Sequence, residues 1–250
     1  MVDAWLERTA LLIGQEAVNT LKASKVLIVG LGGVGSFAAE FLGRAGIGSM
    51  TLVDGDCVDV SNKNRQLIAL DSTLGLHKTE VMAQRLLDIN RDIKLSVISH
   101  FQEPEDMQKL LNEPFDYILD CIDSVQPKLN LLACCQHSDT PIISSMGAGG
   151  RINPVGVGVY SLFETKNCPF AHQIRKSYRK MGWKRNIPVV ASNAPVIPSS
   201  LQLTDGNRYK KSFYGTISYL PALFGLHAAA HVIQALIEKN GANYRFLNCS

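Results

Sequence analysis

The 250-residue chain has no Cys-x-x-Cys pair, and its six cysteines are scattered over the sequence. A zinc site built from four thiolates needs such pairs, so we expect no zinc. Six cysteines are also too few for a disulfide scaffold, which leaves reduced intracellular thiols as the ordinary alternative. The N-terminus holds no apolar signal-peptide core, because Asp3, Glu7 and Arg8 interrupt it. We therefore expect a cytoplasmic protein.

Charged residues are absent from one long apolar segment, residues 215–237. About 20 apolar residues suffice to cross a bilayer, so length alone permits a membrane span. Pro221, His227 and His231 fit a membrane interior poorly, and a helix that is apolar on all sides is also typical of a protein core. The composition of this segment favours a buried helix, and we expect no stable membrane insertion.

The net charge of +3 is small, but it conceals an asymmetry. Residues 161–215 hold ten lysines and arginines and two acidic residues, so this segment alone carries +8 and the rest of the chain is negative overall. A basic segment on an acidic body suggests an anionic macromolecular partner, the alternative being a solvated helix face. The candidate nucleic-acid contacts in it are Arg175, Lys176, Arg179, Lys180, Lys184 and Arg185.

Short apolar runs alternate with helical patterns of about a dozen residues in the first two thirds of the chain. This alternation is typical of βαβ units and predicts an α/β fold, a doubly wound Rossmann-like, mostly parallel sheet with helices on both faces and a C-terminal extension. Strands are predicted at 26–29, 50–53, 95–99, 117–120, 141–145 and 155–160. Helices are predicted at 3–22, 36–45, 78–89, 127–137 and 169–181, and a long loop at 183–214.

A glycine-rich turn lies between the first predicted strand and the next helix, with glycines at Gly30, Gly32, Gly33 and Gly35. Glycines let backbone N–H groups approach a phosphate, and the helix N-terminus adds positive potential. Asp54 ends the second predicted strand, where an acidic residue can accept hydrogen bonds from ribose hydroxyls. Turn, strand, helix and acid together predict a nucleotide site. Without a ligand, the same pattern would be a tight turn.

The residues after Asp54 favour an ATP enzyme over a dehydrogenase. Arg65 and Lys78 would face a triphosphate, and Asp123, after the fourth predicted strand, would hold Mg²⁺ together with phosphate oxygens. A nicotinamide enzyme needs no such combination of cations and a metal carboxylate, although each residue alone has a structural alternative as a surface charge or helix cap. Beyond the glycines and Asp54, the candidate ATP ligands are Asp56, Asn64, Arg65, Gln66, Lys78 and Asp123.

These motifs, taken in order, resemble the ubiquitin-activating superfamily in its bacterial ThiF/MoeB branch, whose members adenylate a carboxylate. The matching positions are Gly30 to Gly35, Asp54, Ser61 to Gln66, Gly75 with Lys78, and Asp120 with Asp123. The resemblance implies ATP and Mg²⁺ and leaves open a monovalent cation, K⁺ or Na⁺. It also implies a homodimer in which Arg8, six residues before Gly14, reaches the partner subunit's site in trans. The implied catalytic set is Arg8, Asn64, Arg65, Lys78 and Asp123.

The same resemblance implies one domain of this family over residues 1–250. Its expected parts are an N-terminal helical segment (1–24), an ATP-binding core (25–160), and a basic substrate-side segment that continues through the long loop to the C-terminal helix (161–250). Within the branch, the likeness extends to members that dehydrate threonylcarbamoyladenosine in the anticodon loop of tRNA. There the free carboxylate of the modified nucleoside is adenylated and then closes into a ring.

Two alternatives stay open from the sequence. An enzyme that adenylates the C-terminal Gly-Gly of a ubiquitin-like sulfur-carrier protein would share the ATP site, and a nucleotide-dependent regulatory module would bind ATP without turnover. A sulfur-relay protein partner stays open as well. Cys168 is a candidate for a thioester with such a carrier, the alternative being a thiol at a helix start.

Overall fold

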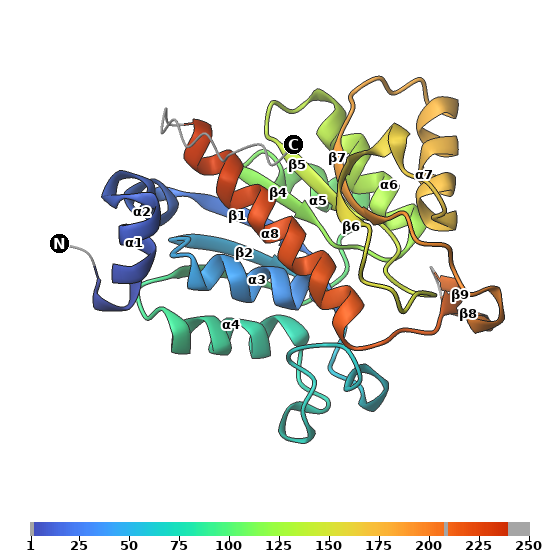
Figure 1. Cartoon of the computed structure of the whole chain (residues 1–250), viewed down its shortest axis with the longest axis horizontal. Coiled ribbons are helices and arrows are strands. Elements are labelled where there is room, and N and C mark those ends of the chain that lie inside the picture. Colours follow the sequence, from blue (N-terminus) through green and yellow to red (C-terminus); the bar gives the residue numbers. More distant parts are fainter. Residues whose placement is uncertain (1–2, 208–209, 240–250) are drawn as a thin grey trace.

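A seven-stranded sheet runs through the centre of the computed structural model, which describes residues 3–207 and 210–239 (Figure 1). Along the sheet the order is β3 (Lys94–Ile98), β2 (Ser49–Val53), β1 (Lys25–Val29), β4 (Tyr117–Asp120), β5 (Ile142–Ser145), β7 (Pro188–Ser192) and β6 (Val157–Ser161). All neighbours are parallel except β6, which is antiparallel to β7. The predicted doubly wound, mostly parallel α/β sheet is confirmed.

Helices cover both faces of the sheet, because alternate residues of the central strands point to opposite sides. In β1, Val26 and Ile28 pack into one core, whereas Leu27 and Val29 pack into the other. The first face carries α2 (Gln15–Ala23), α3 (Gly35–Arg44), α4 (Lys78–Ile89) and α8 (Tyr219–Lys239). The second carries α5 (Pro104–Leu110), α6 (Val125–Cys134) and α7 (Pro169–Lys180). Short 3₁₀ turns lie at Ala4–Leu6, Val60–Asn62, Asp71–Thr73, Cys135–His137, Leu162–Glu164 and Pro198–Ser200.

The N-terminal segment is not the single helix predicted over 3–22. It divides into α1 (Glu7–Ile13) and α2, with Gly14 between them at φ +80°. That backbone conformation favours glycine and ends an α-helix. The apolar pattern continues on both sides of the break, since Ile13, Val18 and Leu21 are all buried. The periodicity therefore indicated helical structure but not the change of direction.

The predicted long loop at 183–214 is also wrong. It contains β7, which pairs with both β5 and β6, and a hairpin of β8 (Leu201–Asn207) with β9 (Lys210–Tyr214). Val189 and Val190 are fully buried, so β7 belongs to the interior of the sheet. The strand has only five residues and begins at a proline, so its own sequence gives a weak strand signal. Its pairing with β5 and β6 holds it in the sheet. The short helix α5 was missed as well.

The apolar helix expected at 215–237 is present as α8 and packs along α3 (Figure 1). Gly225 allows the close approach, because a Cβ there would lie 2.6 Å from the Val34 carbonyl oxygen. Leu220, Phe224 and Val232 are fully buried in the same core as β1. By length and composition α8 could cross a membrane, but half of its most apolar window is buried inside the protein.

Candidate nucleotide-binding site

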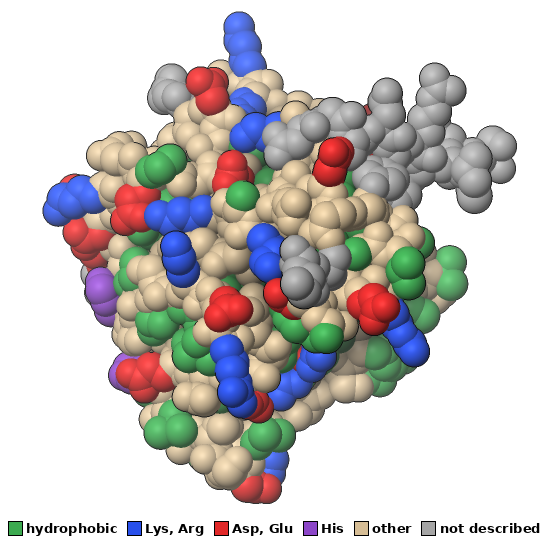
Figure 2. All heavy atoms as spheres, turned by 90° about the vertical axis from the view of Figure 1, so that its left-hand side faces the viewer, with side chains coloured by type: hydrophobic (Ala, Val, Ile, Leu, Met, Phe, Trp, Pro, Cys, Tyr) green, Lys and Arg blue, Asp and Glu red, His purple; other side chains and the backbone are tan. Residues whose placement is uncertain are grey.

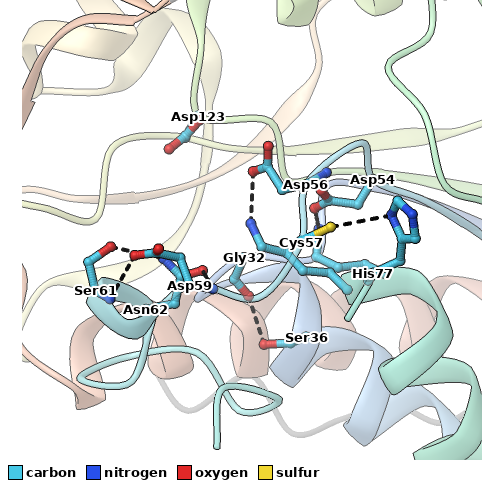
Figure 3. A network of polar contacts seen from close by, with 12 residues as sticks. Gly32, Ser36, Asp54, Asp56, Cys57, Asp59, Ser61, Asn62, His77 and Asp123 are labelled. Atoms are coloured by element: carbon cyan, nitrogen blue, oxygen red, sulfur yellow. Dashed lines mark hydrogen bonds and ion pairs between the residues drawn. The ribbon is translucent and has the colours of Figure 1, made fainter. Parts of the chain in front are cut away.

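The predicted site residues come together because β1, β2 and β4 are parallel neighbours. Their carboxyl ends meet at one edge of the sheet, the edge at which open α/β sheets bind ligands. The glycine turn follows β1, Asp54 and Asp56 follow β2, and Asp123 follows β4. Figure 3 shows Asp54, Asp56 and Asp123 on the loops at this edge.

Three of the four glycines in the turn are needed for packing. Gly30 has φ +93°, and a Cβ there would lie 2.9 Å from the Cys121 carbonyl oxygen. A Cβ at Gly35 would lie 1.8 Å from the Gly30 carbonyl oxygen, and one at Gly33 would lie 2.9 Å from the Pro221 Cβ. Gly32 differs, because the nearest atom to its Cβ position is Gln66 Nε2 at 3.8 Å. Gly32 is thus the one glycine of the four at which an added Cβ would make ordinary van der Waals contact without a clash.

This difference predicts opposite outcomes for two alanine substitutions. We expect Gly35→Ala to lower the free energy of unfolding by about 2 kcal/mol or more, because the backbone must shift to admit the methyl group. Gly32→Ala should change it by less than about 0.5 kcal/mol. Urea denaturation measures both. Equal stability of the two variants would contradict the packing described for the turn.

Asp54 links the loops after β1 and β2. Its Oδ2 accepts a hydrogen bond from the Leu31 backbone N–H (2.6 Å), and its Oδ1 accepts one from the Asp56 backbone N–H (2.8 Å). Burial raises the pKa of this carboxyl group, although the charge of Lys78 and the two backbone N–H groups oppose the rise. Each oxygen keeps a second lone pair, so Asp54 can still accept hydrogen bonds from a ligand.

Lys78 places a buried positive charge at the same edge. It is the first residue of α4, and its side chain is only 6% exposed. The ammonium group lies 2.8 Å from Asp56 Oδ2, and its backbone N–H donates to the Asp56 carbonyl oxygen. This ion pair holds Lys78 in position at the site. Because the Asp56 side chain is 54% exposed, its carboxylate can turn toward solvent when a ligand takes its place beside Lys78.

The segment from Ser61 to Gln66 joins the glycine turn to the start of α8. Arg65 donates to the Ser61 carbonyl oxygen and to Asn64 Oδ1, and Asn64 Nδ2 donates to the Thr216 carbonyl oxygen. Gln66 is buried beside Gly32, and its Oε1 has no hydrogen-bond partner. A buried acceptor without a partner costs free energy. This unmatched atom beside Gly32 fits a site that takes a polar ligand.

Beside the Asp123 loop lies a buried polar cluster, of which the sequence motif named Asp120 but neither Lys128 nor Ser144. Lys128 of α6 and Asp120 of β4 are both 0% exposed and form an ion pair of 2.6 Å, with Ser144 hydrogen-bonded to both. Asp120 Oδ1 also accepts from the Ile122 backbone N–H, which fixes the loop that carries Asp123. Lys128 is the one charged residue of α6, and this was the available signal.

A second missed residue is Arg151, which is 4% exposed. Its guanidinium donates to the carbonyl oxygens of Gly147, Gly149, Asn167 and Ala194. These carbonyl groups come from the loops after β5 and β7 and from the turn before α7. One side chain therefore fixes three loops next to the predicted site.

Arg8 is not brought to these residues within the chain. It lies exposed on α1, and Leu6 just before α1 packs against Gly46 beyond the C-terminal end of α3, at the opposite edge of the sheet. Among the residues 3–207 and 210–239, no group of three or more histidine, cysteine, aspartate or glutamate side chains is placed to hold a metal ion.

The basic residues of the C-terminal segment divide into two groups. Lys176, Arg179, Lys180 and Lys184 are exposed, and Arg175 is half-buried with a hydrogen bond to Thr165. Arg185 instead donates to the carbonyl oxygens of Cys135, Ser138 and Thr140, so its guanidinium is engaged in the fold. Cys168 is buried and its Sγ accepts from the Ala171 backbone N–H, as expected of a thiol at a helix start.

The glycine turn, the acid after β2 and the charged edge define a nucleotide-binding α/β protein, and the chain belongs to the ThiF family, which matches residues 6–250. The tRNA threonylcarbamoyladenosine dehydratase of Escherichia coli (strain K12) is 35% identical over 257 residues, covering 95% of this chain and 96% of that protein. The crystal structure of E. coli TcdA in complex with ATP matches with a TM-score of 0.86 at 34% identity, covering 97% and 98% of the two chains.

A second kind of relative matches less of the chain. The molybdopterin-synthase adenylyltransferase of Haemophilus influenzae is 38% identical over 168 residues, 67% of this chain and 65% of that protein. The predicted resemblance to the ThiF/MoeB branch is confirmed, and both kinds of relative named in the prediction are found.

Proposed function

We propose that the chain is an ATP-dependent tRNA threonylcarbamoyladenosine dehydratase, which cyclises the threonylcarbamoyl group of an adenosine in the anticodon loop. The observation that carries the proposal is the extent of the likeness. The match to the E. coli dehydratase covers at least 95% of both chains, whereas the match to the adenylyltransferase stops at about two thirds. With tRNA as substrate, we also propose a cytoplasmic location.

ATP would supply the activation, because transfer of its AMP group to the substrate carboxylate creates a leaving group that the carbamoyl group then displaces. The chain provides a fitting set of contacts. The backbone at Gly32 and the N-terminus of α3 would receive phosphates, and Asp54 would accept hydrogen bonds from ribose hydroxyls. The unpartnered Gln66 Oε1 would meet a donor of the nucleotide.

Three further side chains would offset the negative charge that develops on the phosphates. Lys78 brings a fixed cation, and Arg65 and Asn64 reach the same edge from the segment that contacts Thr216, just before α8. Asp123 would hold Mg²⁺, which needs few carboxylates when phosphate oxygens complete its shell. The substrate carboxylate is already ionised at neutral pH, so no general base is required. Because Asn64 contacts Thr216, we infer that the core and the C-terminal segment act as one domain.

Arg8 would act on the site of a partner subunit in a homodimer. It lies on α1 beside two apolar side chains that point to solvent, Leu11 and Leu12, which are 82% and 81% exposed. Figure 2 views the molecule from the side on which α1 and α2 lie, and hydrophobic side chains stand there among charged ones. Exposed leucines next to a predicted trans arginine favour a subunit contact at this helix.

The test is incubation of the purified chain with ATP, Mg²⁺ and three acceptors: tRNA carrying threonylcarbamoyladenosine, unmodified tRNA, and a carrier peptide ending in Gly-Gly. We expect AMP and pyrophosphate with the modified tRNA alone, and a loss of one water from the modified nucleoside by mass spectrometry. Asp123→Ala should abolish both, whereas Glu105→Ala on the exposed surface of α5 should change neither. Turnover with the peptide alone would assign the chain to the carrier-adenylating enzymes, and ATP binding without turnover would leave the regulatory alternative.

A further inference from the structure

A cavity lies at the carboxyl edge of the sheet, on the side away from the glycine turn. Its volume is about 350 Å³, and its walls come from the first turns of α7 (Pro169, His172 and Arg175) and from the loop after β7 (Pro195 and Val196). Since β7 runs parallel to β5 and β5 to β4, this loop ends at the same edge as Asp123. The cavity size is within the ordinary range of ligand pockets.

Arg151 holds the walls of this cavity in place. Its Nη2 donates to the carbonyl oxygen of Asn167, just before α7 (2.7 Å), and its Nε donates to that of Ala194, just before Pro195 (2.8 Å). Within the described part of the chain, its hydrogen bonds all go to neutral carbonyl groups. A buried guanidinium without a paired carboxylate leaves positive charge beneath the cavity. Arg151 thus connects the two walls and places a positive charge behind them.

The side chains around the opening have the same sign. No acidic residue lines the cavity, which contains Arg175 and His172 near the N-terminus of α7, the positive end of a twelve-residue helix. Burial lowers the pKa of Arg175, Cys168 opposes this shift, and the charge of Arg179 adds to it. An anion next to the Arg175 guanidinium would favour its charged form. One of its N–H groups is used by Thr165, so others can reach a ligand.

The remaining lining is mostly apolar. Cys168, Pro169, Pro195 and Val196 contribute to it, Asn167 is its one polar member besides the two basic residues, and the exposed His172 adds an aromatic ring. Apolar walls and an imidazole suit a stacked base, and a neighbouring guanidinium suits its phosphate. We propose that this cavity binds one unstacked nucleotide of the tRNA anticodon loop, next to the modified adenosine whose carboxylate enters the ATP site. The assignment rests on the proposed function, because it takes tRNA as the substrate.

The experiment measures binding rather than turnover. A fluorescent anticodon stem–loop carrying threonylcarbamoyladenosine is titrated with the full-length protein by anisotropy at several salt concentrations. Val196→Phe fills the cavity without changing its charge, and His172→Ala removes the exposed ring. We expect each to raise Kd about tenfold with an unchanged salt dependence. Arg175→Ala should raise Kd and also make the negative slope of log K against log salt shallower by about 0.7 to 0.9. Lys109→Ala, on exposed α5, is the charge-matched control and should match wild type.

A second set of RNAs tests for a base inside the cavity. In each RNA, one loop nucleotide beside the modified adenosine is replaced by an abasic residue. At the position that enters the cavity, the abasic RNA should bind wild type about tenfold more weakly, and His172→Ala and Val196→Phe should add no further loss. The proposal would be overturned if His172→Ala and Val196→Phe bound RNA with wild-type affinity. It would also be overturned if, at every abasic position, the loss from the RNA and the loss from the protein variant added in full. Thermal melts check that the variants are folded.

The two proposals fail in different ways. If the wild-type protein dehydrates the modified tRNA while the cavity variants bind RNA normally, the cavity assignment is wrong and the proposed function stands. If the protein leaves the nucleoside unchanged but binds the stem–loop with the expected dependence on the cavity, the function is wrong and the RNA site stands.

Discussion

Replacing Lys78 by methionine is expected to lower kcat/KM for dehydration by about a thousandfold while leaving the fold intact. The methionine side chain keeps most of the apolar stem of the buried lysine and removes only the charge. Asp56, which loses its partner, is 54% exposed, so water can solvate its carboxylate and the cost in stability is small. The lowered kcat/KM would therefore come from the missing interaction between the ammonium group and the nucleotide phosphates.

Steady-state kinetics with modified tRNA and varied ATP, together with thermal melts, measure this effect. Lys63→Met is a matched control, because Lys63 belongs to the same connection between β2 and α4 but pairs with Asp71, which is 84% exposed. It should retain activity within about threefold of wild type. A loss of less than tenfold for Lys78→Met would remove Lys78 from the group that stabilises the phosphates.

The positions of the predicted site residues follow from a local rule. The glycines, Asp54, Asp56, Lys78 and Asp123 each stand shortly after a strand or at the start of the next helix, and parallel strands bring all such positions to one edge. The apolar runs that define β1, β2 and β4 are buried on both faces, so they are readable without tertiary information. Helix α4 was predicted at its observed bounds because Lys78 opens a clean helical pattern.

What the sequence did not reveal depends on contacts between distant segments. Asn64 meets Thr216 across 152 positions, and Arg185 donates to carbonyl groups some 50 residues earlier. The basic pattern around Arg185 predicted a nucleic-acid contact, but a guanidinium is equally suited to exposed carbonyl groups at the end of a helix. Arg151 is similar, since nothing in its neighbourhood of the sequence shows the three loops that meet around it.

The second large effect is expected in stability, at the buried pair of Lys128 and Asp120. Lys128→Met leaves Asp120 fully buried without its cation, and we expect the free energy of unfolding to fall by about 3 to 5 kcal/mol. Adding Asp120→Asn removes the stranded charge while an amide can still hydrogen-bond to Ser144, so the double variant should regain most of the loss. Urea denaturation measures both variants.

The surface pair of Lys109 and Asp106 provides the control for this prediction. Its side chains are 77% and 48% exposed, so Lys109→Met should change the free energy of unfolding by less than about 0.5 kcal/mol. If Lys128→Met were equally mild, the pair would contribute no net stability. The double variant also separates the stability of the fold from the position of the Asp123 loop. Asp120 Oδ1 accepts a hydrogen bond from the Ile122 backbone N–H, and a neutral side chain holds that loop more weakly. A stable double variant with lowered activity would therefore show that the buried charge also sets the position of Asp123.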